Sequence, residues 1–301
     1  MKRDFLALWD FESREIEKVL DRAAELKSGK DKSLCPLIGK SIGLIFEKAS
    51  TRTRVSFETA IYQLGANSIY MNPNEIQLNR GETIADTARV LSTYLDGVII
   101  RTFGHERIEE FAANSSMPVI NGLTDKHHPC QVLADLLTIK EKKGRLRGIK
   151  MAYVGDGNNV ANSLIEAASR MGINLSLACP EGFEPDPFIF ERASAEAKSE
   201  IIILREPREA AGGADVVYTD VWVSMGEEKK SEEKKKRFKD FQINDKLLSC
   251  AKPDAIVMHC LPAHRGEEIA SEVMDGPRSV VFEQAANRLH TGKAVLEKIL
   301  S

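Results

Sequence analysis

The chain has 301 residues, which is enough for two domains of about 150 residues each. A hydrophobic content of 43%, a charged content of 29% and a formal net charge of −3 are typical of a soluble globular enzyme. They argue against a nucleic-acid-binding or membrane-surface protein. No apolar run approaches the roughly 20 residues that cross a bilayer, and the first residues lack the apolar segment of a signal peptide. The five cysteines are scattered without a Cys-x-x-Cys pair, so we expect reduced thiols in a cytoplasmic protein.

Apolar periodicity predicts alternating helices and strands along the whole chain. We expect helices over residues 13–29, 51–64, 84–95, 105–113, 129–143, 159–171, 187–198 and 285–300, and we expect Ser13 to cap the first of them. We expect strands over residues 41–47, 66–71, 97–101, 118–120, 149–154, 173–179, 201–204, 214–218, 255–259 and 279–282. This alternation indicates parallel, doubly wound α/β sheets, which bind ligands beyond the carboxyl ends of their strands.

A polar stretch over residues 144–148 separates two such series of elements and contains Arg145 and Arg147. It predicts a domain boundary, with one domain over residues 1–143 and a second that begins at residue 144. Within the second domain, a dense run of Glu and Lys extends from Glu227 to Arg237. Such a run is typical of a solvated helix or a flexible insert.

The five residues Ser50-Thr51-Arg52-Thr53-Arg54 lie where a predicted strand turns into a predicted helix. Ser50 or Thr51 can cap this helix, whose free N–H groups and dipole attract an anion. Two guanidinium groups and three hydroxyls favour phosphate in particular. The segment is not a Walker A loop, because the Gly-Lys-Ser/Thr sequence is missing. A solvated helix start with ordinary surface arginines is the alternative interpretation.

Other polar residues follow predicted strands at their carboxyl ends. They are Arg101, Asp220 and residues 127–131, 156–159 and 260–262. The strand ends of two sheets can face one cleft, so this repeated placement indicates a ligand site. A guanidinium that ends an apolar strand, as Arg101 does, needs an anion or hydrogen-bond acceptors. His128 by itself is equally compatible with a structural hydrogen bond.

Two further patterns leave alternatives open. Cys260 is either a small core residue or a nucleophile with His259 or His264 nearby, although neighbouring strand residues point to opposite faces. The spacing of these three residues matches no common zinc site. The segment Gly155-Asp156-Gly157-Asn158-Asn159 has two of the three glycines of a dinucleotide fingerprint, and Val160 stands at the third position. Its paired asparagines suit the charged ends of an amino acid instead.

Taken together, the motifs resemble those of the aspartate/ornithine carbamoyltransferase family, and of its ornithine branch, over essentially the whole chain. Residues 50–54 are similar to the carbamoyl-phosphate signature, and residues 128–131 are similar to a second signature. Asp220 with Ser224-Met225-Gly226, and residues 259–262, are similar to the marks of the ornithine branch. The resemblance implies two α/β domains with the active site in the cleft between them. It assigns carbamoyl phosphate to residues 1–143, ornithine to residues 144–285, and a C-terminal helix over residues 286–301 that packs back on the first domain.

The resemblance also implies the reaction and its residues. A carbamoyl group would pass from carbamoyl phosphate to the δ-amine of ornithine, giving citrulline and phosphate, without a metal or organic cofactor, in a trimer or an assembly of trimers. The residues implied for carbamoyl phosphate are Ser50, Thr51, Arg52, Thr53, Gln77 (from a neighbouring subunit), Arg101, His128, Gln131, Cys260, Leu261 and Arg288. Those implied for ornithine are Asn159, Asp220, Ser224 and Met225. The catalytic roles fall on Arg101, His128, Thr53 and Cys260.

The chemistry of the acceptor agrees with those roles. An alkyl amine with a pKa of about 10.4 attacks only when it is neutral, so the site must capture or create that form. A proton can leave with the phosphate, which favours Cys260 as a positioning group over a covalent nucleophile. Alternative functions are a carbamoyltransferase for putrescine or an acylated ornithine, an NAD-dependent dehydrogenase, and a non-catalytic anion-binding protein.

Overall fold

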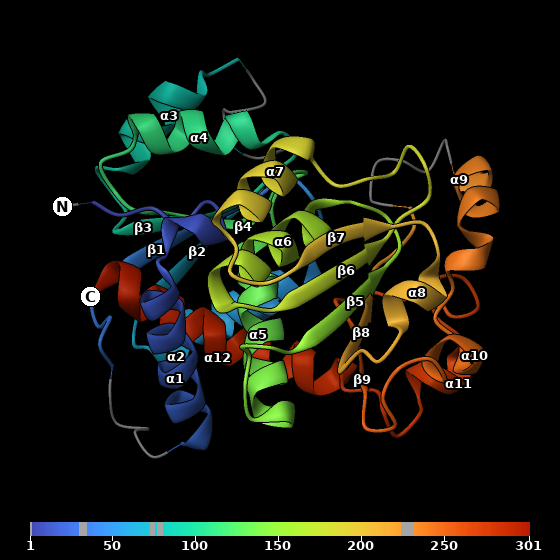
Figure 1. Ribbon diagram of the computed structural model, residues 1–301. Helices are drawn as coiled ribbons and strands as arrows, with labels where there is room; N and C mark the ends of the chain where they lie inside the picture. The colour runs from blue at the N-terminus through green and yellow to red at the C-terminus, as the bar shows by residue number, and fades with distance from the viewer. Residues whose placement is uncertain (1, 30–34, 73–75, 77–80, 224–230) are drawn as a thin grey trace. The chain divides into compact units, whose positions relative to one another are not determined.

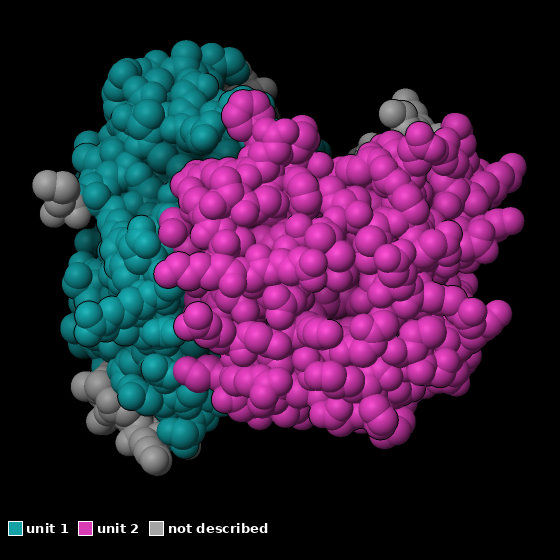
Figure 2. All heavy atoms as spheres, viewed as in Figure 1, with its two compact units in different colours: residues 1–137, 286–301 teal, residues 138–285 magenta. Residues whose placement is uncertain are grey.

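The computed structural model describes residues 2–29, 35–72, 76, 81–223 and 231–301. Its contacts divide the chain into unit 1, residues 1–137 and 286–301, and unit 2, residues 138–285. Figure 2 colours the atoms of the two units, and Figure 1 labels their elements. Each unit contains one parallel sheet, as the alternation of elements predicts.

Unit 1 contains a four-stranded parallel sheet with the strand order β2-β1-β3-β4. Its strands are β1 (Ser41–Phe46), β2 (Asn67–Met71), β3 (Gly97–Arg101) and β4 (Val119–Leu123). Its helices are η1 (Leu8–Asp10), α1 (Ser13–Ser28), α2 (Thr51–Gln63), α3 (Ile84–Leu91) and α4 (His105–Asn114). Two further helices, α5 (Pro129–Lys143) and α12 (Val281–Leu300), contain residues of both units.

Local sequence explains most helix ends in unit 1. Ser50 caps α2, with its hydroxyl oxygen accepting a hydrogen bond from the Thr53 N–H at 3.3 Å. Gly29 closes α1 in the left-handed region at φ 69°, where glycine has no Cβ to clash. The prediction that Ser13 caps α1 is wrong. Glu12 is the N-cap of α1, and its N–H is bound by the Glu15 carboxylate, which leaves Ser13 as the first helical residue.

The core of unit 1 forms from the buried faces of its sheet and helices. Every residue of β3 is buried, and Ile108 and Phe111 of α4 pack with Ile45, Val98 and Ile100. At Gly97 a Cβ would lie 2.7 Å from Cδ2 of Leu300, so a larger residue would require the Leu300 side chain to shift away from β3. This contact ties the last turn of the chain to the sheet of unit 1.

Unit 2 contains a five-stranded parallel sheet with the strand order β7-β6-β5-β8-β9. Its strands are β5 (Lys150–Val154), β6 (Asn174–Ala178), β7 (Ile201–Leu204), β8 (Val216–Thr219) and β9 (Ile256–His259). Its helices are α6 (Asn159–Met171), α7 (Pro187–Glu196), α8 (Pro207–Ala211), α9 (Ser231–Phe238), η4 (Lys239–Phe241), α10 (Asp245–Leu248) and α11 (Ser271–Met274). The short helices α8, α10 and α11 were not predicted, because four or five residues carry too little periodicity.

The strand expected over residues 279–282 is wrong. Ser279 forms only an isolated bridge with Val257, and α12 begins two residues later, at Val281, instead of at Ala285. A short apolar run does not distinguish a buried strand from the first turn of a buried helix. Here Val281 is buried and Phe282 is 64% exposed, which places the run at the start of α12.

Part of the charged run that begins at Glu227 forms α9, while residues 227–230 lie outside the described part of the chain. Glu232, Glu233 and Lys236 are exposed, as a solvated helix requires. Lys234, in contrast, is 6% exposed and lies one turn before the buried Phe238. The expectation of a solvated segment is therefore wrong for the inner face of α9.

Candidate active site

In unit 1, the turn after β1 opens directly into the N-terminus of α2. The first N–H groups of a helix have no intrahelical acceptor, and the helix dipole adds partial positive charge there. Thr53 is buried, whereas the side chains of Thr51 and Arg52 are exposed to solvent. The turn thus presents backbone donors together with one exposed guanidinium, which is a suitable arrangement for a phosphate group.

Three buried side chains form a network beside this turn. The Arg288 guanidinium donates from Nη1 to Gln131 Oε1 at 2.6 Å and from Nη2 to Thr53 Oγ1 at 3.1 Å. Gln131 is oriented in turn, because its Nε2 donates to Asp135 Oδ1 at 2.8 Å. The three residues come from α12, α5 and α2, so tertiary folding brings a charge from the end of the chain to the anion-binding turn.

Arg101 ends β3 at an irregular point of the sheet. Ile100 pairs with Asn121 and Arg101 pairs with Leu123, so Gly122 is an extra residue in β4. A Cβ at Gly122 would lie 3.2 Å from the Ile100 carbonyl oxygen, which disfavours any larger residue at this bulge. Bulges redirect side chains near functional sites, and the Arg101 side chain is buried at this strand end.

His128, which directly precedes α5, lies near two cations. Burial lowers the pKa of its imidazole well below 6.5, and the positive charges of Arg288 and Arg101 lower it further. His128 is therefore neutral at neutral pH, and can donate a hydrogen bond from one ring nitrogen without adding charge. Arg101, His128 and Arg288 are thus close enough to interact electrostatically, which makes this region of unit 1 cationic.

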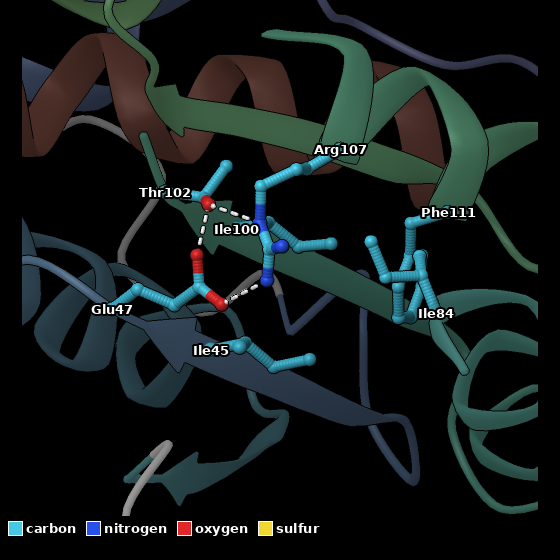
Figure 3. Close-up of a pocket in the computed structure, with 7 residues that line it drawn as sticks. All are labelled: Ile45, Glu47, Ile84, Ile100, Thr102, Arg107 and Phe111. Atoms are coloured by element: carbon cyan, nitrogen blue, oxygen red, sulfur yellow. Dashed lines mark hydrogen bonds and ion pairs between the residues drawn. The ribbon is translucent and has the colours of Figure 1, made fainter. Parts of the chain in front are cut away.

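A recess lies behind the strand end that carries Arg101 (Figure 3). Phe46 is paired with Arg101, so the alternation of strand residues places Glu47 and Thr102 on the opposite face of the sheet. There the Glu47 carboxylate accepts from Thr102 Oγ1 and from Arg107 Nη2, the latter at 2.6 Å. The space measures about 270 Å³ including part of the open solvent, less than a typical ligand pocket of roughly 300–1,000 Å³.

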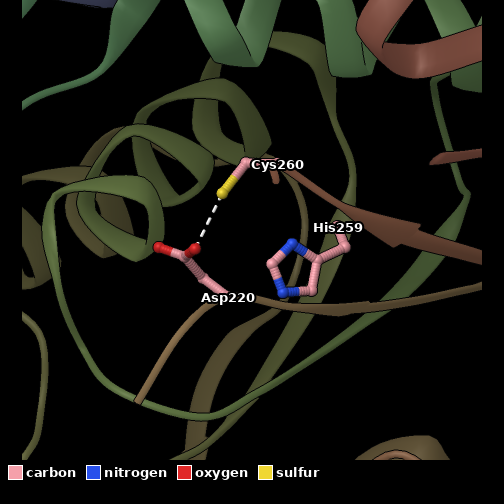
Figure 4. A group of neighbouring side chains, drawn as sticks. All are labelled: Asp220, His259 and Cys260. Carbon is pink, nitrogen blue, oxygen red and sulfur yellow. Dashed lines mark hydrogen bonds between the residues drawn. The ribbon is translucent and has the colours of Figure 1, made fainter. Parts of the chain in front are cut away.

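In unit 2, polar residues follow the three adjacent strands β5, β8 and β9. Asp220 follows β8 and is 5% exposed. Its Oδ1 accepts from Cys260 Sγ at 2.7 Å and from the Val221 N–H at 2.8 Å, and its Oδ2 accepts from Asn158 Nδ2 at 2.8 Å. Figure 4 shows the Cys260 thiol directed at this carboxylate. Among the described residues, all hydrogen-bond donors to Asp220 are neutral, so a cationic ligand group would complete its pairing.

The strand end that carries Cys260 is fixed by a buried histidine. Leu261 has φ 61°, in the left-handed region that a branched side chain rarely adopts. Its N–H donates to His259 Nδ1 at 2.8 Å, so Nε2 carries the ring proton and donates to the buried Glu268 carboxylate at 3.0 Å. This network holds the backbone on either side of Cys260.

Asp220, His259 and Cys260 offer ligand atoms within 4.8 Å of one another, which raises the question of a metal ion. The hydrogen bonds of the three residues argue against a metal ion at this cluster. Both ring nitrogens of His259 are occupied by Leu261 and Glu268, and the Cys260 thiol hydrogen is donated to Asp220. A metal would have to displace the thiol hydrogen and one of the two His259 hydrogen bonds, so we interpret the cluster as a hydrogen-bond network.

The sequence-derived site residues are thus distributed over both units. Unit 1 contains Ser50, Thr51, Arg52, Thr53, Arg101, His128, Gln131 and Arg288, and unit 2 contains Asn159, Asp220, Cys260 and Leu261. Gln77, Ser224 and Met225 lie outside the described residues. The pair Asn158 and Asn159 was expected to suit an amino acid, but only Asn159 was among the residues that the resemblance implied. In the structure the Asn158 amide contacts Asp220, while Asn159 lies in the first turn of α6.

With this geometry in view, the fold and the two sites define a two-unit α/β protein with an anion pocket in one unit and a buried carboxylate in the other. Comparison with known families identifies the class. Residues 3–141 match the carbamoyl-P binding domain of aspartate/ornithine carbamoyltransferase, and residues 147–299 match its Asp/Orn binding domain. The chain belongs to the aspartate/ornithine carbamoyltransferase family.

Individual relatives resemble the chain over its whole length. An ornithine carbamoyltransferase from Syntrophus aciditrophicus (strain SB) is 54% identical over 302 residues, which is 100% of both chains. A protein from Thermoplasma acidophilum named ornithine carbamoyltransferase, catabolic, is 53% identical and covers 100% of this chain and 99% of its own. The solved ornithine carbamoyltransferase from Pyrococcus furiosus superposes with a TM-score of 0.95 at 50% identity, covering 99% of this chain and 97% of its own.

Proposed function

We propose that this chain is an ornithine carbamoyltransferase of arginine metabolism, which transfers the carbamoyl group of carbamoyl phosphate to the δ-amine of L-ornithine. The observation that carries the choice of acceptor is the buried Asp220 carboxylate and its neutral donors. The ammonium group of an amino acid satisfies such a carboxylate. An acidic acceptor side chain would bring a second negative charge toward it, which favours ornithine over aspartate.

We assign carbamoyl phosphate to the cationic region of unit 1. Ser50, Thr51, Arg52 and Thr53 would hold the phosphate together with the N–H groups at the start of α2. Arg101 and neutral His128 would polarise the carbonyl oxygen and stabilise the charge of the tetrahedral intermediate, with Thr53 assisting. Gln131, Arg288 and the Leu261 carbonyl would orient the carbamoyl group. The hydrogen bonds of Arg288 to Gln131 and Thr53 support this assignment.

We assign the acceptor to the carboxyl ends of β5, β8 and β9 in unit 2. Asp220 and Asn159 would bind the α-amino and α-carboxylate groups, with Ser224 and Met225 contributing from the segment that follows Asp220. Asn158 orients Asp220 through its amide. Cys260 would steer the δ-amine as a thiol, because its hydrogen is already donated to Asp220. The proton of the attacking amine would leave with phosphate, so no covalent intermediate on sulfur is required.

We further propose a cytoplasmic homotrimer, or an assembly of trimers, in which Gln77 reaches the carbamoyl phosphate of a neighbouring subunit. The exposed apolar side chains of Val55, Tyr62 and Ile69 on α2 and β2 support an interface in unit 1. In the described part of the chain, no helix has the length and apolar character needed to span a bilayer.

The decisive experiment supplies purified protein with carbamoyl phosphate and each of three acceptors, L-ornithine, L-aspartate and putrescine. Citrulline should form with ornithine at a kcat/KM far above that of the other two. Putrescine lacks the α-amino acid groups that Asp220 and Asn159 would hold, so it tests the acceptor site directly. Formation of no citrulline at saturating substrates would overturn the proposal, and a preference for putrescine would replace it.

A further inference from the structure

Lys234 is the one described residue of the charged run whose cation is buried. Its Nζ lies 2.8 Å from Asp156 Oδ2, and the two side chains are only 7% and 12% exposed. Nζ also lies 5.4 Å from the ring centroid of Phe183 and 5.9 Å from that of Phe238. A lysine is seldom held this way without a specific anionic partner, because burying an unpaired ammonium costs several kcal/mol.

Asp156 belongs to the turn between β5 and α6 that orients the acceptor site. Its carbonyl oxygen accepts from Tyr153 Oη at 2.7 Å and from the Asn158 N–H at 2.8 Å. The Asn158 amide then donates to Asp220, which receives the Cys260 thiol. Two hydrogen bonds of Asn158 therefore connect Asp156 to Asp220: its backbone N–H binds Asp156, and its side-chain amide binds Asp220.

The negative charges of Asp156 and Asp220 both act on the hydroxyl group of Tyr153. Burial raises the pKa of Tyr153 well above 10, and the negative charges of Asp220 and Asp156 both raise it further, with a smaller effect from Cys260. Tyr153 is thus close to both carboxylates. Without a cation at Asp156, the turn would present two negative charges to an incoming amino acid instead of one.

The other ionisable groups around Asp156 come from the segment after β6 and from α9. Burial raises the pKa of Cys179 to about 12, with Asp156 and Glu184 adding to the effect and Arg205 opposing it. Glu184 is already paired with Arg205. On α9, Arg237 donates to the Glu181 carbonyl oxygen at 2.8 Å and lies over Phe183. Among these described neighbours, Lys234 is the cation that contacts Asp156.

We propose that Lys234 is a charge-setting residue of the acceptor site, which neutralises Asp156 so that Asp220 alone attracts the ammonium groups of ornithine. The inference rests on the proposed function. Through Lys234, α9 would lower the pKa of the δ-amine of bound ornithine and so favour its neutral form. A second uncompensated carboxylate would bind the doubly cationic amino acid more tightly but would stabilise the protonated δ-amine, which does not attack.

The test is the pH dependence of kcat for ornithine in Lys234→Met, which removes the cation and keeps an unbranched apolar side chain of similar length. The acid limb of the profile, which reports the enzyme–substrate complex, should move to higher pH by about 0.5–1 unit, as expected for a unit charge roughly 10 Å away at an effective dielectric constant of about 20–40. The KM for ornithine should fall. Asp156→Asn should move the acid limb to lower pH and raise that KM.

The double variant Lys234→Met/Asp156→Asn removes both charges and should return the acid limb to its wild-type position. Lys236→Met is the matched control, because Lys236 is an exposed lysine on the same helix, and its profile should match the wild type. A purely structural role predicts that both single variants lose activity without opposite shifts, and that outcome would overturn the proposal. Failure of the proposed function is distinguishable, since the wild-type protein would then form no citrulline.

Discussion

The polar groups beyond the two sheets differ in charge and in the way they are held. In unit 1, the positive charges of Arg101 and Arg288 act on the neutral His128, and Arg288 also contacts Thr53 in the first turn of α2. In unit 2, the central group is the carboxylate of Asp220, held by an amide, a thiol and a backbone N–H. A cationic region suits an anionic donor and a carboxylate suits a cationic acceptor, so under the proposed function we expect each unit to select its substrate by charge.

The difference extends to tolerance of mutation. Under the proposed function, the residues of unit 1 would act through full charges, whose removal would leave a bound anion poorly compensated. The site of unit 2 orients one carboxylate through neutral hydrogen bonds, each contributing about 1 kcal/mol. We therefore expect larger losses from substitutions in unit 1 than in unit 2.

The largest effect should come from Arg101→Ala. Loss of this guanidinium should reduce kcat/KM for carbamoyl phosphate by about 10²–10³-fold, or roughly 3–4 kcal/mol of transition-state stabilisation, as for other oxyanion donors. Steady-state kinetics checks it, with the exposed Arg89→Ala on α3 as the matched control. A loss below about tenfold would remove Arg101 from the catalytic residues.

Arg288→Met should follow, with a loss of about 30–100-fold in kcat/KM for carbamoyl phosphate. The variant leaves the Gln131 and Thr53 oxygens without their charged donor, and hydrogen bonds to charged groups are worth about 1.5–3 kcal/mol. Thermal unfolding of the same variant separates this effect from a loss of fold. An unchanged KM for carbamoyl phosphate together with an unchanged kcat would contradict the assignment.

Cys260→Ala should cost about tenfold in kcat and should not abolish activity, because we propose that the thiol, which donates to Asp220, only positions the amine. Cys260→Ser retains a donor to Asp220 and should lose less. Mass spectrometry of the wild-type enzyme during turnover provides the opposing test. A carbamoyl group trapped on Cys260, together with complete inactivity of the alanine variant, would show that the cysteine is a nucleophile.

Per pH unit, the smallest effect concerns the acid stability of unit 1. Burial lowers the pKa of His105 to about 3, with His127 and Lys126 contributing, while an unfolded histidine titrates near 6.5. The unfolded chain therefore binds the extra proton first, and the free energy of unfolding falls as pH decreases from about 6.5 toward 3. His105 should contribute up to about 1 kcal/mol per pH unit of this loss.

Denaturant unfolding of His105→Asn at several pH values between 4 and about 7 checks that contribution, since the variant should show a shallower slope. Asparagine can retain a hydrogen bond with Thr124, which His105 contacts through Nδ1 at 3.0 Å. A slope equal to that of the wild-type protein would mean that His105 does not resist protonation in the folded state.

Much of the fold was predictable because local signals and tertiary packing agreed. The strand over residues 97–101, the helix over residues 159–171 and the strand over residues 201–204 have the predicted bounds. Ser50 caps α2 because a hydroxyl directly before a helix binds a free N–H wherever that helix packs. Prediction failed at residues 279–282, where a short apolar run satisfied two periodicities and packing against the rest of the chain selected the helix.

The site residues likewise include some that the sequence could identify and some that it could not. Spacing alone marked residues 50–54 and the polar residues at strand ends, since the order of a parallel α/β fold brings those ends together. Spacing gave no reason to choose Asn158 over Asn159, or to separate Lys234 from its charged neighbours, because such choices depend on which helix face is buried.

The sequence by itself determined the alternation of strands and helices, a helix start at Ser50 or Thr51, and the chemical types of the polar groups beyond the strands. Those features arise from periodicity and from hydrogen bonds between residues a few positions apart. Only the tertiary structure decided that Arg288 contacts Thr53 across 235 positions, that the Cys260 thiol points to Asp220 and that Lys234 is buried against Asp156. Burial and charge compensation are properties of the packed chain, because they depend on neighbours that are distant along the sequence.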